Sequence, residues 1–503
     1  MTTEAASPTK VQHRGRVLAA LVATMALAAM DTTIVATTVP QVVADLGGFS
    51  LFSWVFSSYL LTQTVTIPIY GKLADIYGRK PVLLAGAAIF LVGSALCAVS
   101  PNMVALIVFR GIQGIGAGGA QATISTVASD LYSIAERGRV QGWLSSVWGI
   151  SAIVGPTLGG TFAEYASWRW IFLVNVPIGA VAVFLLVRYL HEEVPRTEHR
   201  VDYLGATVVL LASGAVFFGL LQGGTAWGWT SPASLSVFGA AALFAVLAVF
   251  VERRAAEPIM PSWMWKRRVL AGSCLATVGL GLLVIGPTTF LPTYGQTLLG
   301  LGPVPAGLVL ASMSVTWPLA SAFSARLYMW LGFRDAALVG ALLCVSGAAT
   351  LFVLPDPGSV WLLVLAAAIL GGGFGLLSAA LLVGVQAGVG WSERGVVTGA
   401  IQFARFLGQG LGAAVFGAVS NATLSARLGD APPELAGELP SDVNGVSEEL
   451  GSHGAAAPGA GYLRHILYDG MHNVFLTLLI IAIGVVVVLV VLTPRRFPVR
   501  DQD

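Results

Sequence analysis

The chain has 503 residues, of which 56% are hydrophobic and only 10% carry a charged side chain. Soluble domains carry roughly 25% charged residues, so this composition excludes an ordinary soluble protein and indicates many membrane crossings. The formal net charge of +2 gives no reason to expect a nucleic-acid partner. The three cysteines, Cys97, Cys274 and Cys344, lie in apolar segments at unrelated spacings, so we expect neither a disulfide framework nor a metal site.

A bilayer-spanning helix needs about 20 apolar residues. By this length the sequence predicts fourteen spans, at residues 17–40, 50–70, 81–100, 103–129, 140–163, 170–190, 203–222, 233–251, 269–294, 304–324, 336–354, 360–385, 396–420 and 472–493. The basic segment before them, residues 1–16, is followed by no small-residue cleavage site, so we expect an N-terminal tail and a retained first span.

The positive charges predict the orientation, because short cytoplasmic loops carry an excess of Lys and Arg. With the N-terminus inside, only Arg169, Arg427 and Arg464 of the 27 Lys and Arg residues fall on the outer side. Arg110 and Arg405 lie within spans. We therefore expect both termini, including a tail at 494–503, to be cytoplasmic.

The first span contains Asp31, the only acidic residue that we find within any predicted span. Ionised Asp in hydrocarbon costs about 2.5 to 3.5 kcal/mol on insertion scales, so we expect it to face a cavity, to be paired or to bind a proton. The segment from Met30 to Pro40 resembles the first-helix motif of the fourteen-helix drug:proton antiporters. The resemblance implies that Asp31 couples protons or contacts cationic substrate. The alternative is an Asp satisfied by neighbouring Thr hydroxyls and the backbone.

A charged connection, GKLADIYGRK from Gly71 to Lys80, follows the second span. Its glycines, Gly71 and Gly78, suit a tight turn and close helix approach at the water interface. The pattern resembles the loop between helices 2 and 3 of the major facilitator superfamily. The expected topology places Asp75 and Arg79 close to Asp130 and Arg137 at the cytoplasmic edge of the membrane. We therefore predict that these four residues form an inner gate. The alternative is that these charges, with Lys80, only set the topology.

Arg110 lies in the fourth span, and the segment RGIQG from Arg110 to Gly114 resembles the R-x-x-Q-G motif of the superfamily. The resemblance implies that this arginine assists proton transfer at the acidic site. A permanent cation would lower the pKa of a nearby carboxylate. A purely structural arginine, anchored to backbone carbonyls, is the alternative.

The fifth span carries a glycine and proline pattern that gives a thin, kinkable helix surface. It resembles the antiporter motif, which in this superfamily is associated with exporters, and its residues are Gly149, Gly155, Pro156, Gly159 and Gly160. Outward transport is predicted mainly from this pattern. Gly and Pro are also frequent in membrane helices generally.

An internal repeat organises the chain. Gly78, Lys80 and Gly86 recur at identical spacing as Gly332, Arg334 and Gly340. We therefore predict a six-helix bundle at 17–190, a linker with two inserted membrane helices at 191–268, and a second six-helix bundle at 269–493. The second bundle includes a flexible outer loop at 421–471, in which Gly461–Gly470 forms either a surface helix or the start of the last helix.

Polar and aromatic side chains within the spans are candidates to line a substrate cavity. They are Trp54, Tyr59, Gln63, Trp148, Phe290, Tyr294, Gln402, Phe403 and Arg405. Gln402 and Arg405 are favoured, because a buried cation needs a paired or water-filled environment. Aromatic residues at helical spacing are more often packing residues. Relatives that expel divalent cations carry a further acidic residue near Gln402, and its absence here argues against dicationic substrates.

These observations predict an all-α polytopic membrane protein with the major facilitator fold and 14 transmembrane helices. The resemblance implies proton-coupled export of hydrophobic or amphipathic drugs by alternating access, with the proton gradient as energy source and no cofactor. We expect a monomer in the cytoplasmic membrane that binds its substrate, protons and lipid. A dedicated exporter of one natural product or lipid is the alternative, and a non-transporting sensor or intramembrane enzyme a remote one. We see no nucleophile and base pair, phosphate loop or metal cluster, so we expect no enzyme.

Overall fold

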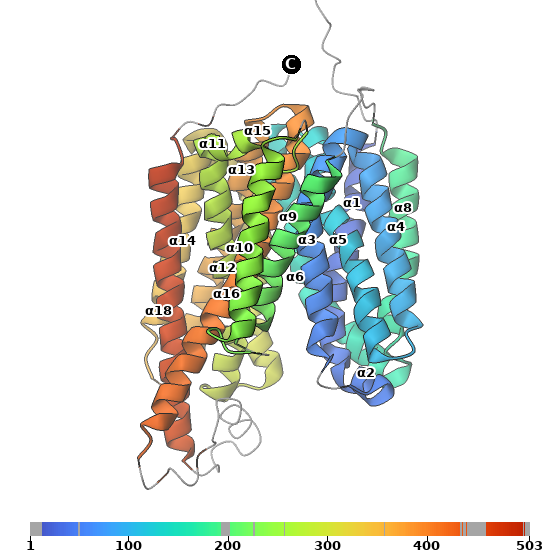
Figure 1. The fold of residues 1–503 in the computed structure, drawn as a ribbon. Coiled ribbons are helices and arrows are strands. Elements are labelled where there is room, and N and C mark those ends of the chain that lie inside the picture. Colours follow the sequence, from blue (N-terminus) through green and yellow to red (C-terminus); the bar gives the residue numbers. More distant parts are fainter. Residues whose placement is uncertain are drawn as a thin grey trace, which may run out of the picture.

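The computed structural model describes residues 13–48, 51–192, 202–224, 227–255, 257–356, 358–432, 435, 439, 459–495 and 497. These residues are almost entirely helical, and their β-structure is limited to one isolated bridge between Gly223 and Trp227. Figure 1 shows long helices that run side by side in two bundles. The predicted all-α class is therefore confirmed.

The first bundle contains the helices that precede residue 190. They are α1 (Arg14–Ile34), η1 (Val35–Thr38), α2 (Val39–Leu46), α3 (Ser53–Tyr77), α4 (Arg79–Ala98), α5 (Met103–Leu131), α6 (Ile134–Tyr165), α7 (Trp170–Leu173) and α8 (Asn175–Tyr189). Local signals begin several of them. The side chain of Asn102 accepts a hydrogen bond from the Ala105 amide at the start of α5, and Ser133 and Glu136 form a capping box at the start of α6.

The second bundle and the inserted pair follow. The pair is α9 (Tyr203–Gln222) and α10 (Pro232–Glu252). The second bundle contains α11 (Ser262–Lys266), α12 (Arg268–Thr297), α13 (Pro303–Leu331), α14 (Phe333–Phe352), α15 (Val360–Ala387), η3 (Trp391–Glu393), α16 (Arg394–Gly429) and α18 (Ala460–Leu492). We call the end of the molecule at which α1 begins and α18 ends the terminal end, and the end that carries α2 the distal end.

Each of the fourteen predicted spans falls largely on described helix. Eleven helices among the described residues are long and apolar enough to cross a membrane. The helices α3, α6 and α16 do not meet this criterion. All three lie along the seam between the bundles, where they carry polar residues of the central cavity, and this accounts for their lower hydropathy.

The repeat is visible in the geometry of the two bundles. Gly78 and Gly332 adopt left-handed φ angles of 93° and 88° at equivalent turns, where a residue with a Cβ atom would be strained. The residues two positions later behave alike. Lys80 Nζ donates to the Val187 carbonyl at 3.0 Å, and Arg334 Nε donates to the Leu489 carbonyl at 3.2 Å. Lys80 therefore joins α4 to α8 in the first bundle, and Arg334 joins α14 to α18 in the second.

The outer loop predicted at 421–471 is shorter than expected. Helix α16 continues to Gly429 and α18 begins at Ala460, so the connection spans 430–459, most of which lies outside the described residues. The Gly461–Gly470 segment is the start of the last helix, and the surface-helix interpretation is wrong. The two extensions support each other, because Arg427 pairs with Asp469 at 2.9 Å and Asn473 Nδ2 donates to Thr423 Oγ1 at 3.1 Å.

The bundles meet through small residues near the terminal end. A Cβ atom on Gly71 of α3 would lie 3.2 Å from the Gly399 Cα of α16, and one on Gly138 of α6 would lie 2.7 Å from the Ala325 Cβ of α13. Small residues of this kind let membrane helices approach closely. Figure 1 shows the bundles close together at the terminal end, drawn at the top, and further apart toward α2.

The inserted pair lies across the seam, with α9 packed on both α3 and α16 (Figure 1). Phe218 of α9 contacts Trp54 of α3, with ring centroids 5.6 Å apart, and Phe217 packs against Gly410 of α16. Helix α10 is much less buried than α9. Helix α9 thus covers the line along which the two bundles meet.

Candidate functional site

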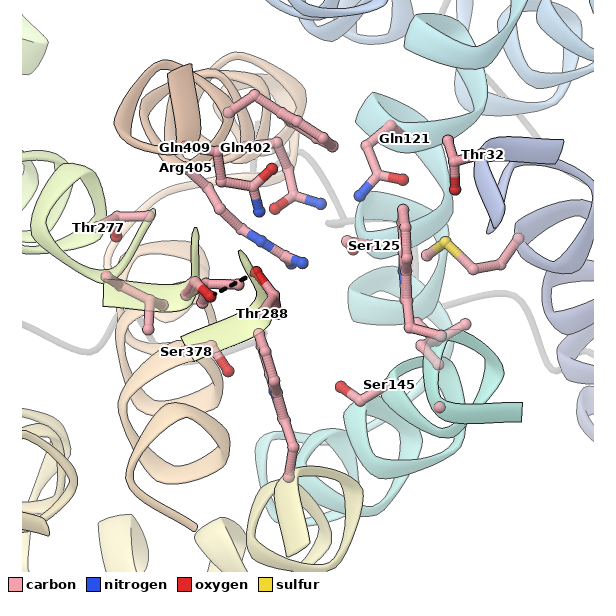
Figure 2. Close-up of a pocket in the computed structure, with 18 of the residues that line it drawn as sticks. Thr32, Gln121, Ser125, Ser145, Thr277, Thr288, Ser378, Gln402, Arg405 and Gln409 are labelled. Carbon is pink, nitrogen blue, oxygen red and sulfur yellow. Dashed lines mark hydrogen bonds between the residues drawn. The ribbon is translucent and has the colours of Figure 1, made fainter. Parts of the chain in front are cut away.

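A cavity of about 330 Å³ lies between the two bundles. Four helices of the first bundle, α1, α3, α5 and α6, and four of the second, α12, α13, α15 and α16, contribute side chains to its wall. Figure 2 shows Arg405, Gln402 and Gln409 extending from α16 into the cavity, opposite Gln121 and Ser125 of α5.

Four of the nine predicted cavity residues line this space, namely Gln63, Trp148, Gln402 and Arg405. The other five do not, because they pack between helices. Trp54 contacts α9, Tyr59 lies under Arg110, Phe290 packs edge-on against Phe416, Tyr294 is buried beside Phe475, and Phe403 joins a cluster around Ile67. Aromatic character alone therefore did not distinguish cavity residues from core residues.

Several lining residues were not predicted from the sequence. The polar ones are Thr32, Thr33, Gln121, Ser125, Gln141, Ser145, Thr277, Thr288, Ser314, Ser378 and Gln409. The glutamines carried a usable signal, because an amide side chain inside an apolar span needs a polar partner or a cavity. The small hydroxyl residues carried none, since Ser and Thr satisfy themselves on helix carbonyls, as Thr277 does with Ser273 at 2.7 Å.

Asp31 lies in a closed polar network beside the cavity. Its side chain is completely buried. One carboxylate oxygen forms an ion pair with Arg110 and accepts a hydrogen bond from its Nη1 atom. The other oxygen accepts hydrogen bonds from Gln113 Nε2 at 2.8 Å and from Asn175 Nδ2 at 3.3 Å. Ser94 completes the network, because its hydroxyl accepts from both amides. Asn175 and Ser94 were missed in the sequence, although Asn175 is an amide inside a predicted span.

The alternative in which neighbouring threonines satisfy Asp31 is wrong. Thr32 donates to the Ala29 carbonyl at 2.8 Å, and Thr33 donates to the Ser151 carbonyl of α6 at 2.9 Å. Arg110 has further partners, since its Nε donates to the Val55 carbonyl at 3.2 Å and its guanidinium lies 4.2 Å from the Tyr59 ring centroid. The Asp31 carboxylate is thus held by one cation and two amide groups. The next residue in the chain, Thr32, lines the cavity.

A second charged cluster joins the bundles at the terminal end. Asp75 of α3 accepts hydrogen bonds from the backbone amides of Gly395 and Val396, both at 2.8 Å, at the first turn of α16. A carboxylate is stabilised there by the free amides and the helix dipole. Arg79 Nη2 lies 3.0 Å from Asp75, and its guanidinium stacks on Trp391 of the second bundle at 3.6 Å.

Asp130 extends the cluster. It pairs with Arg394 at 2.9 Å, and Arg79 Nε lies 3.0 Å from its other oxygen as an ion pair without hydrogen-bond geometry. Asp130 therefore joins α5 to α16. The structure does not place Arg137 in these ion pairs, because Arg137 donates to the Ser129 and Tyr132 carbonyls and closes the end of α5 instead.

The glycines of the fifth-span motif let α6 approach its neighbours. A Cβ atom on Gly155 would lie 2.9 Å from the Thr33 Cβ, and one on Gly159 would lie 2.8 Å from the Ile34 carbonyl oxygen, both on α1. Gly149 faces the second bundle, 2.8 Å from the Ser314 carbonyl oxygen by the same measure. Gly160 faces open space, and Pro156 lies inside the continuous helix α6. The motif is thus a packing surface for α1 and α13.

Comparison with known proteins identifies the family to which this fold belongs. The sequence model of the Major Facilitator Superfamily matches residues 21–413. The chain belongs to the Major Facilitator Superfamily. Its fold is also similar to that of the human organic anion transporter MFSD10, with a TM-score of 0.62 and 16% identity over 92% of this chain and 99% of that one. The family and fold are those of a multi-pass membrane transporter.

Similar curated members of the superfamily are named as multidrug transporters or efflux pumps. The chain is 31% identical to the multidrug transporter protein MdtP of Bacillus subtilis, over 95% of this chain and 93% of that one. It is 34% identical to multidrug resistance protein 3 of the same organism, over 84% and 82% of the two chains. It is also 31% identical to the efflux pump LUC4 of a Fusarium species, over 85% and 77%.

In this superfamily member, we expect Gly155→Ala to destabilise the fold by about 1 to 3 kcal/mol, because the new methyl group overlaps Thr33 and pushes α1 away from α6. The matched control is Gly160→Ala, further along the same helix, where the methyl group meets open space. Thermal unfolding of the purified variants in detergent measures both. Equal melting temperatures for the two variants would contradict the packing role of Gly155.

Proposed function

We propose that this transporter exports hydrophobic or amphipathic small molecules in exchange for protons. The observation that carries the proposal is the position of Asp31. This carboxylate is completely buried and ion-paired, and it directly precedes Thr32, which lines the cavity shared by both bundles. A buried carboxylate is the group that a transporter uses to bind and release a proton. The multidrug relatives support small-molecule export as the task.

Transport proceeds by alternating access, in which the bundles rock about the central cavity. The terminal-end cluster of Asp75, Arg79, Asp130 and Arg394 holds one conformation and separates in the other. The cavity is built within one chain, so a monomer suffices. The energy source is the proton gradient, and no cofactor takes part.

The transporter resides in the cytoplasmic membrane with both termini in the cytoplasm. The distribution of Lys and Arg supports this orientation, and it makes the terminal end the cytoplasmic one. The cluster that joins the bundles then closes the cytoplasmic side, and Asp31 receives its proton from outside.

Accumulation assays in a bacterial host depleted of its own drug pumps test the proposal. We expect the chain to lower the accumulation of several amphipathic dyes and antibiotics, and a protonophore to remove the difference. Protection against a single compound would instead indicate a dedicated exporter. Unchanged accumulation of every compound, with the protein shown to be inserted, would contradict export.

A further inference from the structure

The wall of the central cavity carries a single charge. Among the described residues that line it, Arg405 is the only side chain charged at neutral pH, and none is a carboxylate. The rest of the polar wall is neutral and includes five glutamines, which are Gln63, Gln121, Gln141, Gln402 and Gln409. The cavity therefore presents one cation and many neutral hydrogen-bonding groups to a bound molecule.

Arg405 lacks a carboxylate partner in the described part of the chain. Its Nε atom is buried without a hydrogen-bond partner, and no carboxylate oxygen lies within 4.0 Å of its guanidinium. The guanidinium lies near Trp317, whose ring centroid is 5.5 Å away. The fully buried arginines differ from Arg405, because Arg79 and Arg110 are paired with aspartates and Arg137 donates to the Ser129 and Tyr132 carbonyls. An arginine cannot lose its charge at physiological pH, so Arg405 is an uncompensated cation inside the membrane.

Other polar atoms in the cavity wall also lack hydrogen-bond partners among the described residues. Both amide atoms of Gln63 and the Oε1 atom of Gln121 are buried without partners. Figure 2 shows Gln121 on the opposite wall from Arg405 and Gln402. Trp148 and Trp317 provide apolar faces. A ligand that satisfies this wall carries one anionic group, further hydrogen-bonding atoms and an apolar body.

The described residues of the cavity wall offer no carboxylate to a cationic ligand. Asp31 is completely buried, and both of its oxygens are occupied by Arg110, Gln113 and Asn175. Arg405 repels a positive charge placed in the same space. The electrostatics of the wall thus favour an anion over a cation of equal size and shape.

We infer that the preferred substrates are amphipathic organic anions, with an aromatic or aliphatic body and a carboxylate or sulfonate that pairs with Arg405. This inference rests on the proposed export function, since it names the substrate class of that cavity. A guanidinium forms two parallel hydrogen bonds with a carboxylate, which fixes the orientation of the bound molecule as well as its charge.

The test compares three pyrene probes that share one skeleton: pyrenebutyrate, its neutral methyl ester, and a pyrenebutyl trimethylammonium cation. Binding to the purified full-length protein in a non-ionic detergent is measured by energy transfer from tryptophan to pyrene. The variants are Arg405→Gln and Arg405→Lys. The matched control is Arg326→Gln, which removes an exposed arginine outside the cavity.

We expect the wild type to bind pyrenebutyrate at least about tenfold more tightly than the ester, because a hydrogen bond to a charged group contributes roughly 1.5 to 3 kcal/mol. Arg405→Gln should remove this preference, whereas Arg405→Lys and Arg326→Gln should keep it. Thermal unfolding checks that each variant is folded, and retention in the Lys variant separates the charge from a packing role.

Equal wild-type affinity for the three probes, a preference that survives in Arg405→Gln, or no binding of any probe would overturn the inference. Uptake of pyrenebutyrate by everted vesicles separates this result from the proposed function. An anion preference without uptake contradicts export alone. Uptake of the probes without a charge preference contradicts only the assignment of Arg405.

Discussion

Replacing Asp31 by Asn is expected to abolish export driven by a pH gradient. The Asp31→Asn side chain keeps one oxygen, which can still accept the hydrogen bond from Arg110, but it loses the acceptor that faces Gln113 and cannot bind a transferable proton. Export without net proton movement, measured as exchange of labelled for unlabelled substrate, should persist. Loss of driven export with retained exchange is the signature of a coupling residue.

The size of the effect follows from the driving force. With one proton per cycle and no membrane potential, a pH difference of about 2 units supports about a 100-fold substrate gradient, since each pH unit is worth about 1.4 kcal/mol. The Asn variant should support no gradient. The substrate gradient is measured in proteoliposomes with an imposed pH difference. The control variant is Asp335→Asn, which removes a carboxylate that pairs with Arg495 away from the cavity.

Removing one partner of a buried ion pair destabilises a protein by about 3 to 5 kcal/mol, so the folded state of Asp31→Asn needs its own check. Asp31→Glu serves this purpose, because it keeps the charge that faces Arg110. We expect it to retain measurable pH-driven export. A driven gradient of wild-type size in a properly inserted Asn variant would contradict the role of Asp31.

The second large effect is expected at Asp75. This carboxylate holds Arg79 and the first amides of α16 and so joins the two bundles at the terminal end. Asp75→Asn removes its charge and leaves Arg79 partly uncompensated. The ion pair with Arg79 lies within the first bundle, whereas the hydrogen bonds to the α16 amides would be lost when the proposed gate opens. A hydrogen bond to a charged group contributes roughly 1.5 to 3 kcal/mol, so we expect the conformation with an open terminal end to gain about 3 kcal/mol, or roughly 100-fold in population.

Distances between spin labels measure this shift. Tyr77→Cys on α3 and Trp265→Cys on α11 place labels on exposed side chains of opposite bundles, and the three native cysteines are buried. The matched control is Glu192→Gln. Glu192 accepts hydrogen bonds from the Arg79 and Lys80 amides within one bundle, so its loss should not favour opening. Identical distance distributions in the Asp75 variant and the wild type would argue against a gate.

The sequence was most informative where a charge interrupts an apolar helix. Asp31 and Arg110 were singled out inside predicted spans, where an ionised group needs a partner, whereas Asp75 was singled out in the charged connection after the second span. The structure places each of the three in an ion pair. Their exact partners depended on tertiary contacts. Asn175 reaches Asp31 across a separation of 144 residues in the chain, and nothing in its local sequence indicates this contact.

Boundaries and packing were harder to predict. Hydropathy ended the thirteenth span at residue 420, but α16 continues to Gly429, and Arg427 pairs with Asp469 beyond the apolar stretch. Aromatic residues such as Tyr294 and Phe290 resemble ligand contacts in sequence yet fill the space between helices. Whether a side chain faces a cavity or a neighbouring helix is decided by how the bundles meet, which a single sequence does not specify.

Proton release on substrate binding tests coupling through Asp31 most directly. A compound selected in the accumulation assay is added to purified protein in weakly buffered solution, and the change in pH is recorded for the wild type and for Asp31→Asn. We expect proton release from the wild type and none from the variant, with the compound bound by both. Equal release from the two proteins, or wild-type binding without release, would contradict this coupling.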